Sequence, residues 1–345
     1  MKTKVYKITA DAEKNAEIFR QAKHVIESGG VVAFPTETVY GLGANAFDPE
    51  ACRKIYEAKG RPSDNPLILH ISDMSGAEEC GHIGDRGRKL AESFWPGPLT
   101  MVVDRKPGVP DTVTGALDTV ALRMPAHPTA GNLLRTVHIP VAAPSANLSG
   151  SPSPTTAAHV LNDLDGRIDM VIVDDTVNVG LESTIIDVTS ESPVILRPGV
   201  ITREQLEEAL GETVTFAGDD AGEEAPRAPG MKYRHYSPEA GLFLVCGEEK
   251  KRTAAVDRLA AEAETLGKKV FILAQGGSAE KYKCRNVIDL GRRADEAASS
   301  LYGALRQCDD EGADVIFAEG FEEKGVGIAL MNRLKKAAGG NIIQV

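Results

Sequence analysis

The sequence predicts an α/β protein of two domains, and three observations lead to this prediction. The chain has 345 residues, which is long for one domain and comfortable for two. Short apolar runs typical of buried strands alternate with helical patterns on both sides of a central stretch. That stretch, residues 217–230, is rich in acidic residues, alanine, glycine and proline, as linkers are. We therefore expect domains over 1–212 and 239–345, joined by a linker over 213–238.

In the first domain, periodic apolar residues and capping signals predict four helices. The helix over 11–28 stops at a pair of glycines, and the helix over 48–60 starts with Asp48 and Pro49 and stops at Gly60. Ser153 can cap a helix over 154–164, and Thr202 with Gln205 forms a capping box for a helix that ends at Leu210. Apolar runs predict strands over 31–34, 66–71, 99–103, 119–124 and 139–143, one strand that begins at Ser183 and one that ends at Arg197.

In the second domain, strands over 242–246, 269–273, 286–290 and 315–318 alternate with amphipathic helices. The apolar face of the first of these helices includes Val256, Leu259, Ala263 and Leu266. The alternation predicts a small, doubly wound, Rossmann-like α/β domain. The residues of this domain carry no recognisable catalytic motif.

The composition favours a soluble, cytoplasmic chain. A net charge of −11 argues against a protein whose main task is coating nucleic acid, although it leaves room for a local basic groove. Five scattered cysteines without a C-x-x-C pair indicate neither a disulfide framework nor a zinc ribbon. The first ten residues lack a signal-peptide core, and no apolar run reaches membrane-spanning length, so we expect no membrane association.

The two common nucleotide-binding motifs do not account for this chain. Residues 41–46 match G-x-G-x-x-A, but six residues separate them from the preceding strand and no helix starts at the second glycine. The glycines more simply allow close approach of the backbone or a turn. The sequence contains no G-x-x-x-x-G-K-[ST], so a nucleotide site would not be a P-loop.

Polar side chains instead follow several predicted strands and one helix. Lys59, Arg61 and Asn65 lie in a proline-braced turn, where Arg61 and Asn65 could donate to a phosphate, although helix capping explains Lys59 equally well. Further candidates are Thr36 and Thr38 after the first strand, and Ser145 and Asn147 after the strand over 139–143. Arg123 in an apolar strand suits either a buried ion pair or a ligand, and for His70 a satisfied core histidine is the default interpretation.

Taken together, these residues resemble the YrdC family of threonylcarbamoyl-AMP synthases. The resemblance rests on Pro35–Gly43, on Lys59-x-Arg61 with Asn65-Pro66, on Ser145-x-Asn147, and on the stretches 180–187 and 194–199. It implies a twisted mixed sheet with a pocket at the strand ends. Enzymes of this family condense L-threonine, bicarbonate or CO2, and ATP into threonylcarbamoyl-adenylate and release pyrophosphate. A separate transferase then modifies an adenosine of tRNA to threonylcarbamoyladenosine.

The resemblance also implies roles for individual residues of this sequence. Catalysis is expected of Lys59, Arg61, Ser145 and Asn147. ATP is expected to bind at Lys59, Arg61, Asn65, Thr119, Ser145, Ser153, Arg197 and Tyr236. L-threonine is expected to bind at Thr38, His70, Arg123, Ala143 and Ser183. Mg2+ is expected as cofactor, held mainly by the phosphates of ATP.

The end of the linker, residues 229–238, matches the long form of the family, in which this segment folds back over the active site. Lys232, Tyr233, Arg234, His235 and Tyr236 would then form a lid, although they could also merely connect the two domains. The expected partners are the three substrates and the transferase complex that acts on tRNA, with weak RNA contact as a further possibility. Two alternatives remain at this point, an RNA-binding module of the same fold without catalysis and carbamoyl-adenylate chemistry in hydrogenase maturation.

Overall fold

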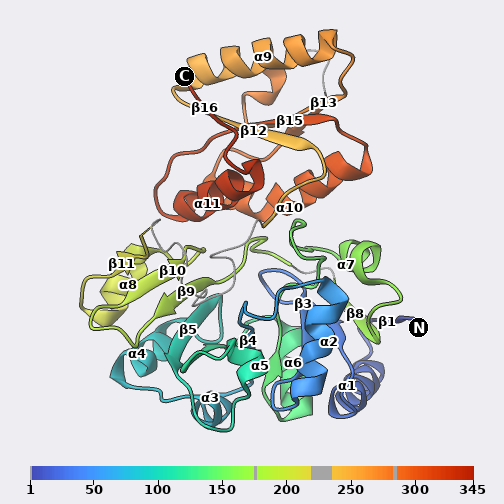
Figure 1. The fold of residues 1–345 in the computed structure, drawn as a ribbon, viewed down its shortest axis with the longest axis vertical. Helices are drawn as coiled ribbons and strands as arrows, with labels where there is room; N and C mark the ends of the chain where they lie inside the picture. Colours follow the sequence, from blue (N-terminus) through green and yellow to red (C-terminus); the bar gives the residue numbers. More distant parts are fainter. Residues whose placement is uncertain (1, 175–176, 219–234, 283–285) are drawn as a thin grey trace. The chain divides into compact units, whose positions relative to one another are not determined.

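A computed structural model of the chain describes residues 2–174, 177–218, 235–282 and 286–345. The chain divides into two compact units, each with its own sheet (Figure 1). The first unit comprises Met1–Ser149, Ser153–Asn178 and Glu182–Lys232, and the second comprises Gly150–Pro152, Val179–Leu181 and Tyr233–Val345. No helix in the described ranges is long and apolar enough to cross a membrane.

The first unit is a mixed α/β structure. Its described strands are β1 (Lys4–Lys7), β2 (Val32–Phe34), β3 (Gly41–Asn45), β4 (Ile68–His70), β5 (Leu99–Asp104), β6 (Thr119–Arg123), β7 (Val141–Ala142), β8 (Met170–Val173), β9 (Thr184–Asp187), β10 (Val194–Arg197) and β11 (Thr215–Phe216). Its described helices are α1 (Ala12–Glu27), α2 (Pro49–Lys59), α3 (Met74–Cys80), α4 (Asp85–Phe94), α5 (Asp111–Thr114), α6 (Pro128–Val137), α7 (Ala157–Leu164) and α8 (Arg203–Leu210).

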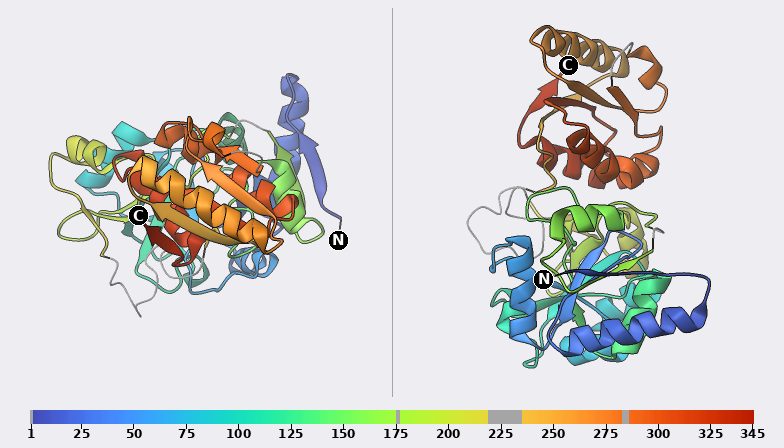
Figure 2. Two further views of the ribbon diagram at one scale, coloured as in Figure 1. Left: turned by 90° about the horizontal axis from the view of Figure 1, so that it is seen from above. Right: turned by 90° about the vertical axis from the view of Figure 1, so that its right-hand side faces the viewer.

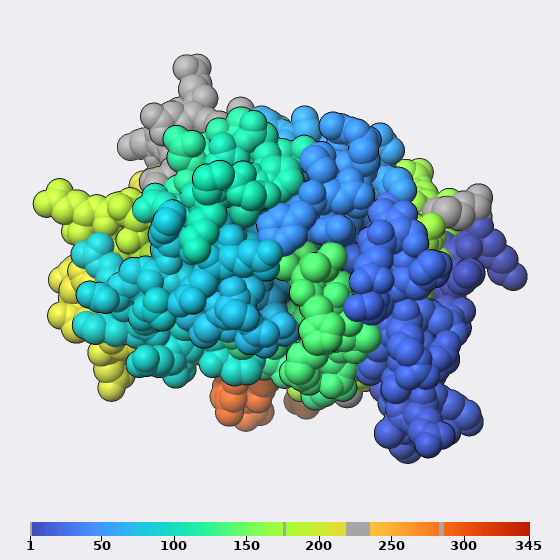
Figure 3. Space-filling model, turned by 90° about the horizontal axis from the view of Figure 1, so that it is seen from below, coloured from blue at the N-terminus to red at the C-terminus, as the bar shows by residue number. Residues whose placement is uncertain are grey.

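The strands form one sheet in the order β1-β8-β2-β3-β7-β4-β6-β5-β9-β10-β11. Parallel and antiparallel pairs both occur, since β4 runs parallel to β6 whereas β5 runs antiparallel to it. Because side chains alternate between the faces of a sheet, the apolar residues divide into separate clusters. Helices α1 and α6, side by side in Figure 3, cover part of one face, and α2, α3, α4, α7 and α8 pack against the other. A smaller apolar cluster, Ile68, Val102, Ala121, Ile185 and Leu196, occupies the central strands.

The predicted ends of α2 are confirmed. The Asp48 side chain accepts from the N–H groups of Glu50 and Ala51, Pro49 is the first helical residue, and Gly60 closes the helix in the left-handed conformation. The capping box of α8 is also present. The prediction that Ser153 caps the next helix is wrong, because α7 starts at Ala157 and Thr156 is its cap.

The two glycines of the motif over 41–46 lie within β3. Gly43 pairs with Val32 of the antiparallel strand β2, so the motif over 41–46 does not open a βαβ unit. A Cβ atom at Gly43 would lie 2.7 Å from side-chain carbons of Phe34 and Val141. Close packing therefore explains this glycine, as expected from the sequence.

The predicted linker over 213–238 begins with ordered structure. Strand β11 pairs in parallel with β10 and extends the sheet of the first unit to Phe216. Lys232, Tyr233 and Arg234 lie outside the described residues, as do 219–231.

The second unit is the parallel α/β structure that the sequence predicted. Its strands are β12 (Gly241–Cys246), β13 (Val270–Ala274), β14 (Asn286–Asp289), β15 (Val315–Glu319) and β16 (Ile342–Gln344), in the order β14-β13-β15-β12-β16. Its helices are α9 (Glu249–Thr265), α10 (Ala294–Asp310), α11 (Val326–Ala338) and the short 3-10 turn η1 (Ala279–Lys281). Figure 2 shows α9 on one face of this sheet and α10 with α11 on the other. Val256 is buried in the α9 face, but Leu266 lies beyond the helix end and is exposed, contrary to its predicted core position.

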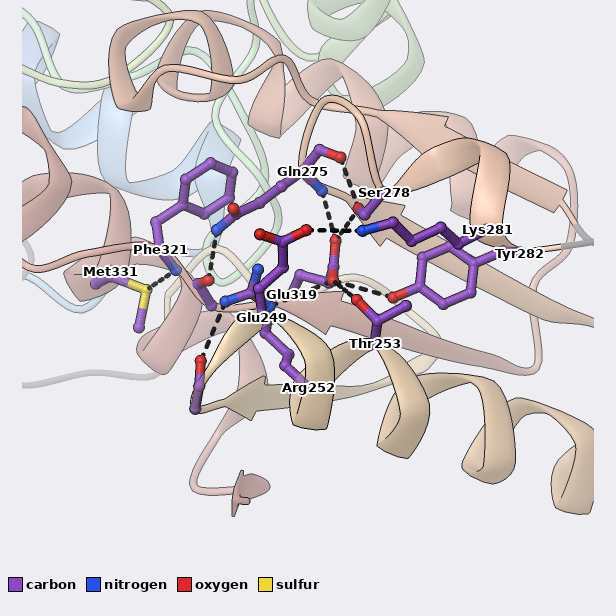
Figure 4. Close-up of polar contacts among 12 residues, drawn as sticks. Glu249, Arg252, Thr253, Gln275, Ser278, Lys281, Tyr282, Glu319, Phe321 and Met331 are labelled. Carbon is purple, nitrogen blue, oxygen red and sulfur yellow. Dashed lines mark hydrogen bonds and ion pairs between the residues drawn. The ribbon is translucent and has the colours of Figure 1, made fainter.

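A buried carboxylate joins the loops at the carboxyl ends of these strands (Figure 4). Glu319, the last residue of β15, is fully buried and lies 3.3 Å from Arg252 Nε of α9. Its oxygens also accept from Tyr282 OH at 3.0 Å, from Gln275 N at 2.7 Å and from the hydroxyl of Ser278. Glu319 thus ties the segment that follows β13 and the start of α9 to the end of β15.

Candidate active site

Four polar side chains form a row across neighbouring strands of the first unit. His70 at the end of β4 pairs in register with Arg123 at the end of β6, and Arg123 pairs with Thr100 of β5. The Thr100 and Ser183 hydroxyls are hydrogen-bonded at 2.7 Å, which adds the residue before β9 to the row. His70 and Arg123 follow Ile68 and Ala121 by two positions, so they lie on the same face as the small apolar cluster. The sequence placed His70, Arg123 and Ser183 in strands or at their ends, and the structure brings these three residues together on this face.

The loop between β2 and β3 contacts the row. Arg123 Nη1 donates to Thr38 Oγ1 at 2.9 Å, and the Thr38 hydroxyl is 2.8 Å from that of Thr36. Arg123 Nη2 lies 2.8 Å from Glu37 Oε1. Burial is the largest influence on the Glu37 carboxyl and raises its pKa, but the charge and contact of Arg123 together with the nearby backbone N–H groups of Glu37 and Ala126 outweigh burial, and the pKa lies below its usual value. The buried ion pair that the sequence suggested for Arg123 is therefore present.

His70 is a neutral hydrogen-bonding group at this site. Burial and, to a smaller extent, the charge of Arg123 lower the pKa of His70 to about 3. Its Nδ1 is 3.2 Å from the carbonyl oxygen of Ile68, which can only accept. Nδ1 therefore carries the proton, and Nε2 is an acceptor.

The backbone of Ala143 offers less than its predicted role suggests. Its N–H already donates to Ile68 O at 2.9 Å, so its carbonyl is the group that could bind a substrate. Thr38, His70, Arg123 and Ser183 are thus linked by direct contacts or strand pairing, and Ala143 adjoins them through Ile68. We call this set, with Thr100, the amino-acid subsite, after the role that the sequence predicts for it.

Lys59 connects helix α2 to the loop after β7. It is 2% exposed, and its Nζ donates to the carbonyl oxygens of Ser145 and Asn147. Within that loop, Ser145 Oγ donates to Asn147 Oδ1 at 2.6 Å. The structure therefore brings three of the four predicted catalytic residues into one cluster. It also corrects the expectation that Lys59 lies in the turn, because Lys59 is the buried last residue of α2.

Arg61 and Asn65 lie in the turn that follows α2. Arg61 is half-buried, and its guanidinium donates to the carbonyl oxygens of Asn65 and Pro66 at 3.3 and 3.0 Å. The Asn65 side chain is buried, and its Oδ1 has no hydrogen-bond partner among the described residues. Thr119 begins β6 on the same face as Arg123, about 13 Å from it at roughly 3.3 Å per residue.

Ser153 and Arg197 are also buried polar residues of the first unit. Ser153 Oγ donates to Glu182 Oε1 at 2.5 Å. Arg197 Nη2 donates to the carbonyl and hydroxyl oxygens of Ser183, at 3.1 and 3.2 Å, and so adjoins the amino-acid subsite.

Tyr236 belongs to the second unit. Its ring stacks on that of Tyr302 at 5.4 Å between centroids, and the Arg333 guanidinium lies 5.4 Å from its ring centroid. Its backbone is in the left-handed region with φ 65°, which is uncommon for a residue other than glycine. Its expected contact with ATP stays a prediction.

Three polar residues of these clusters did not emerge from the sequence as candidates, namely Glu37, Thr100 and Glu182. Thr100 and Glu182 resemble ordinary polar residues beside strands until the pairing of β5 with β6 and the Ser153 contact are known. Glu37 had a weak signal, since it is the one acid in a loop of small hydroxyl residues. No group of three or more His, Cys, Asp or Glu residues in the described ranges is placed to hold a metal ion.

Comparison with known proteins assigns this chain to a family. The Sua5/YciO/YrdC model, described as telomere recombination, matches residues 24–199, and a model described as the threonylcarbamoyl-AMP synthase C-terminal domain matches residues 201–339. The chain belongs to the Sua5 family.

Relatives in the Sua5 family match this chain over almost its whole length. The threonylcarbamoyl-AMP synthase of Bacillus subtilis is 46% identical, with 100% of each chain covered. That of Pyrococcus abyssi is 48% identical over 94% of this chain and 95% of its own. A solved structure of P. abyssi Sua5 complexed with L-threonine has a TM-score of 0.93 at 45% identity and covers 100% of both chains. The expected family, fold and two-domain form are therefore confirmed.

Proposed function

We propose that this chain synthesises L-threonylcarbamoyladenylate from L-threonine, bicarbonate or CO2, and ATP, with release of pyrophosphate. The observation that carries the proposal is the amino-acid subsite, in which a buried arginine, a neutral histidine and three hydroxyls meet on one face of the sheet. Its support is the similarity, over the whole chain, to enzymes named threonylcarbamoyl-AMP synthase. This synthesis would be the first step of threonylcarbamoyladenosine formation in tRNA.

The residues suit a reaction that depends on positioning. Arg123 would bind the threonine carboxylate, and the hydroxyls of Thr38, Thr100 and Ser183 would surround its polar groups. The amino nitrogen of threonine would attack CO2 and lose a proton, which gives a carbamate. A carbamate oxygen would then attack the α-phosphorus of ATP, so that a new P–O bond forms and the bond to pyrophosphate breaks. This step needs no nucleophilic side chain. Burial raises the pKa values of the Cys52 and Cys80 thiols to about 12, so neither is a thiolate near neutral pH.

The phosphate-binding residues have different parts in this scheme. Lys59 shapes the loop that carries Ser145 and Asn147 and adds a positive charge beside it. Arg61, which is half-buried, would contact the triphosphate directly, together with Arg197. Asn65, Thr119 and Ser153 would complete the ATP site. Mg2+ would arrive bound to the phosphates of ATP and neutralise part of their charge.

The location and partners follow from this activity. The adenylate would pass to a transferase complex that acts on tRNA, and the enzyme would therefore work in the cytoplasm. The described cysteines, Cys52, Cys80, Cys246 and Cys308, are all free thiols, which agrees with a reducing compartment.

The burial of the cations disfavours the alternative of an RNA-binding module. Lys59, Arg123 and Arg197 are 2%, 4% and 5% exposed, so their charges cannot form the accessible surface that an RNA backbone requires.

The decisive experiment is an assay of pyrophosphate release from ATP in the absence of RNA. We expect release that requires both L-threonine and bicarbonate, with threonylcarbamoyladenylate as the product seen by mass spectrometry. Release that is independent of either substrate would refute the proposal, and tRNA binding without any release of pyrophosphate would favour the RNA-binding alternative.

A further inference from the structure

Glu37 is a buried carboxylate beside the guanidinium of Arg123. Its side chain is 11% exposed, and Oε1 lies 2.8 Å from Arg123 Nη2 without the alignment of a hydrogen bond. The backbone N–H groups of Glu37 and Ala126 lie near enough to the carboxylate to lower its pKa. Among the described residues, however, no aligned hydrogen bond reaches either Glu37 oxygen, or Nε or Nη2 of Arg123. A buried polar group that lacks a hydrogen-bond partner destabilises the ligand-free protein. Two buried charges that retain unused donors and acceptors indicate a ligand that complements both.

The ligand that fits this pair is a zwitterion. Arg123 can only donate, which suits a carboxylate, and the ionised Glu37 can only accept, which suits an amino group. The pair has no net charge, and neither has a free amino acid. Neutral His70 does not alter this balance, because its pKa is about 3. His127 also lies near Glu37, and burial lowers its pKa below the usual value, which favours its neutral form as well.

We propose that Glu37 binds the α-amino group of the amino-acid substrate while Arg123 binds its carboxylate. This inference rests on the proposed function, which makes L-threonine that substrate. Because Arg123 and the backbone N–H groups near the carboxylate outweigh burial and keep the pKa of Glu37 below its usual value, the carboxylate stays ionised near neutral pH. Glu37 therefore accepts a hydrogen bond from the nitrogen both as ammonium and as neutral amine. It fixes the direction of the nitrogen lone pair and excludes acids without an amino group.

A different role for Glu37 would be to orient Arg123 alone. The two roles differ in which ligands they affect. If Glu37 only orients Arg123, its loss weakens every carboxylate ligand equally. If it binds the amino group, its loss weakens only ligands that have one.

Calorimetric titration of the full chain with three ligands separates these roles. The ligands are L-threonine, its methyl ester, which lacks the carboxylate charge, and 3-hydroxybutanoate, which has hydrogen in place of the amino group. We expect wild-type protein to bind 3-hydroxybutanoate at least tenfold more weakly than threonine. Glu37→Gln should weaken threonine binding at least tenfold and change 3-hydroxybutanoate binding less than twofold.

Two further variants complete the design. Arg123→Leu should weaken threonine binding more than binding of the methyl ester, because the ester has no carboxylate charge for Arg123 to bind. Glu50→Gln is the matched control, since Glu50 is an exposed acid on α2 that pairs with Arg53, and it should change nothing.

Equal losses for threonine and 3-hydroxybutanoate in Glu37→Gln would overturn the assignment, and so would unchanged threonine binding. Should that variant not fold, the wild-type comparison still decides, because equal affinity for the two ligands contradicts the proposal. A wild-type chain that binds no threonine at all would refute the proposed function as well, which distinguishes the two failures.

Discussion

At the scale of single residues, Arg123 shows that two interpretations of a buried charge can hold together. It forms the ion pair with Glu37, and it still has Nε and Nη2 without hydrogen-bond partners among the described residues. Pairing lowers the cost of burying the guanidinium and leaves hydrogen-bond donors for a substrate.

Replacing Arg123 should separate substrate binding from stability. Arg123→Leu should raise the KM for threonine at least tenfold and leave the KM for ATP within twofold. It should also destabilise the fold by about 3–5 kcal/mol, because Glu37 loses its partner inside the protein. The double variant with Glu37→Gln should regain stability in urea unfolding without regaining threonine use. A larger effect on ATP than on threonine would contradict the assigned role of Arg123.

His70 should make the fold sensitive to acid. In the folded chain its pKa is about 3, whereas the ordinary value is 6.5. Between these values the unfolded chain binds more protons, so stability is lost as pH falls from about 6.5 towards 3. His70→Gln should therefore show a shallower decline of the unfolding free energy over this window than wild type does. Identical slopes, measured by urea unfolding at several pH values, would contradict a buried neutral His70.

Lys59 and Arg61 should respond differently to truncation. Lys59→Ala removes buried charge-assisted hydrogen bonds to the 145–147 loop, so it should abolish adenylate formation and cost about 2–4 kcal/mol of stability. Arg61→Ala should abolish activity at a cost of about 1 kcal/mol, since Arg61 is partly exposed. Pyrophosphate release and urea unfolding measure the two effects. Near-normal turnover in either variant would refute the ATP assignment.

The candidate site could be predicted from the sequence in its residues but not in their partners. A lone arginine in an apolar strand and hydroxyl residues that follow strands can be recognised in the sequence alone. The hydrogen bond between Thr100 and Ser183 depends on the parallel pairing of β5 with β9, which no local pattern encodes. The same limit explains the error at Lys59, since a last-turn lysine looks exposed until the loop after β7 is placed over it.

At the scale of elements, strand β3 links packing to the site. Gly43 lies against Phe34, whose ring meets that of His70 edge-on at 6.1 Å. The chain can therefore place β2 and β3 close together only without a side chain at position 43.

Gly43→Ala should accordingly affect both stability and substrate binding. The added methyl group would meet two side-chain carbons at 2.7 Å, which should cost about 1–3 kcal/mol. Displacement of Phe34 should also weaken threonine binding severalfold through His70. Gly108→Ala is a suitable control, because a Cβ atom there meets nothing within 4 Å. Unchanged stability of Gly43→Ala in thermal unfolding would show that the strands can separate without cost.

The element boundaries were most predictable where caps act locally. Asp48, Pro49 and Gly60 define α2 through contacts within a few residues. The prediction that Ser153 is a helix cap failed because its hydroxyl donates to Glu182, which lies far along the chain. Thr156 caps α7 instead. Strand β11 lies at the start of the predicted linker over 213–238, because its two residues are ordered by pairing with β10 and not by their own pattern.

At the scale of the whole molecule, the two units have separate polar centres. The amino-acid subsite belongs to the first, and the Glu319 network belongs to the second. Stability of the second unit should therefore depend on residues that play no part in threonine binding.

Glu319→Ala tests this separation. Loss of a buried carboxylate would leave Arg252 unpaired and destabilise the second unit by about 3–5 kcal/mol. Calorimetric unfolding should show the loss, while the folded variant should bind threonine with wild-type affinity. Weakened threonine binding would show that the two units are energetically coupled.

The row of His70, Arg123, Thr100 and Ser183 has a consequence for folding. Its members come from four segments that are distant in sequence, and each meets its neighbour only when three strand pairings have the correct register. A slip of one residue in β6 would turn Arg123 to the opposite face and bring Leu122 into its place. On the proposed assignment of this row to threonine, partly folded chains should not bind the amino acid, and threonine should select the fully registered sheet from all competing arrangements. In a hydrogen-exchange experiment, threonine should accordingly slow exchange of the central strands as a single cooperative block, far beyond the atoms that it touches.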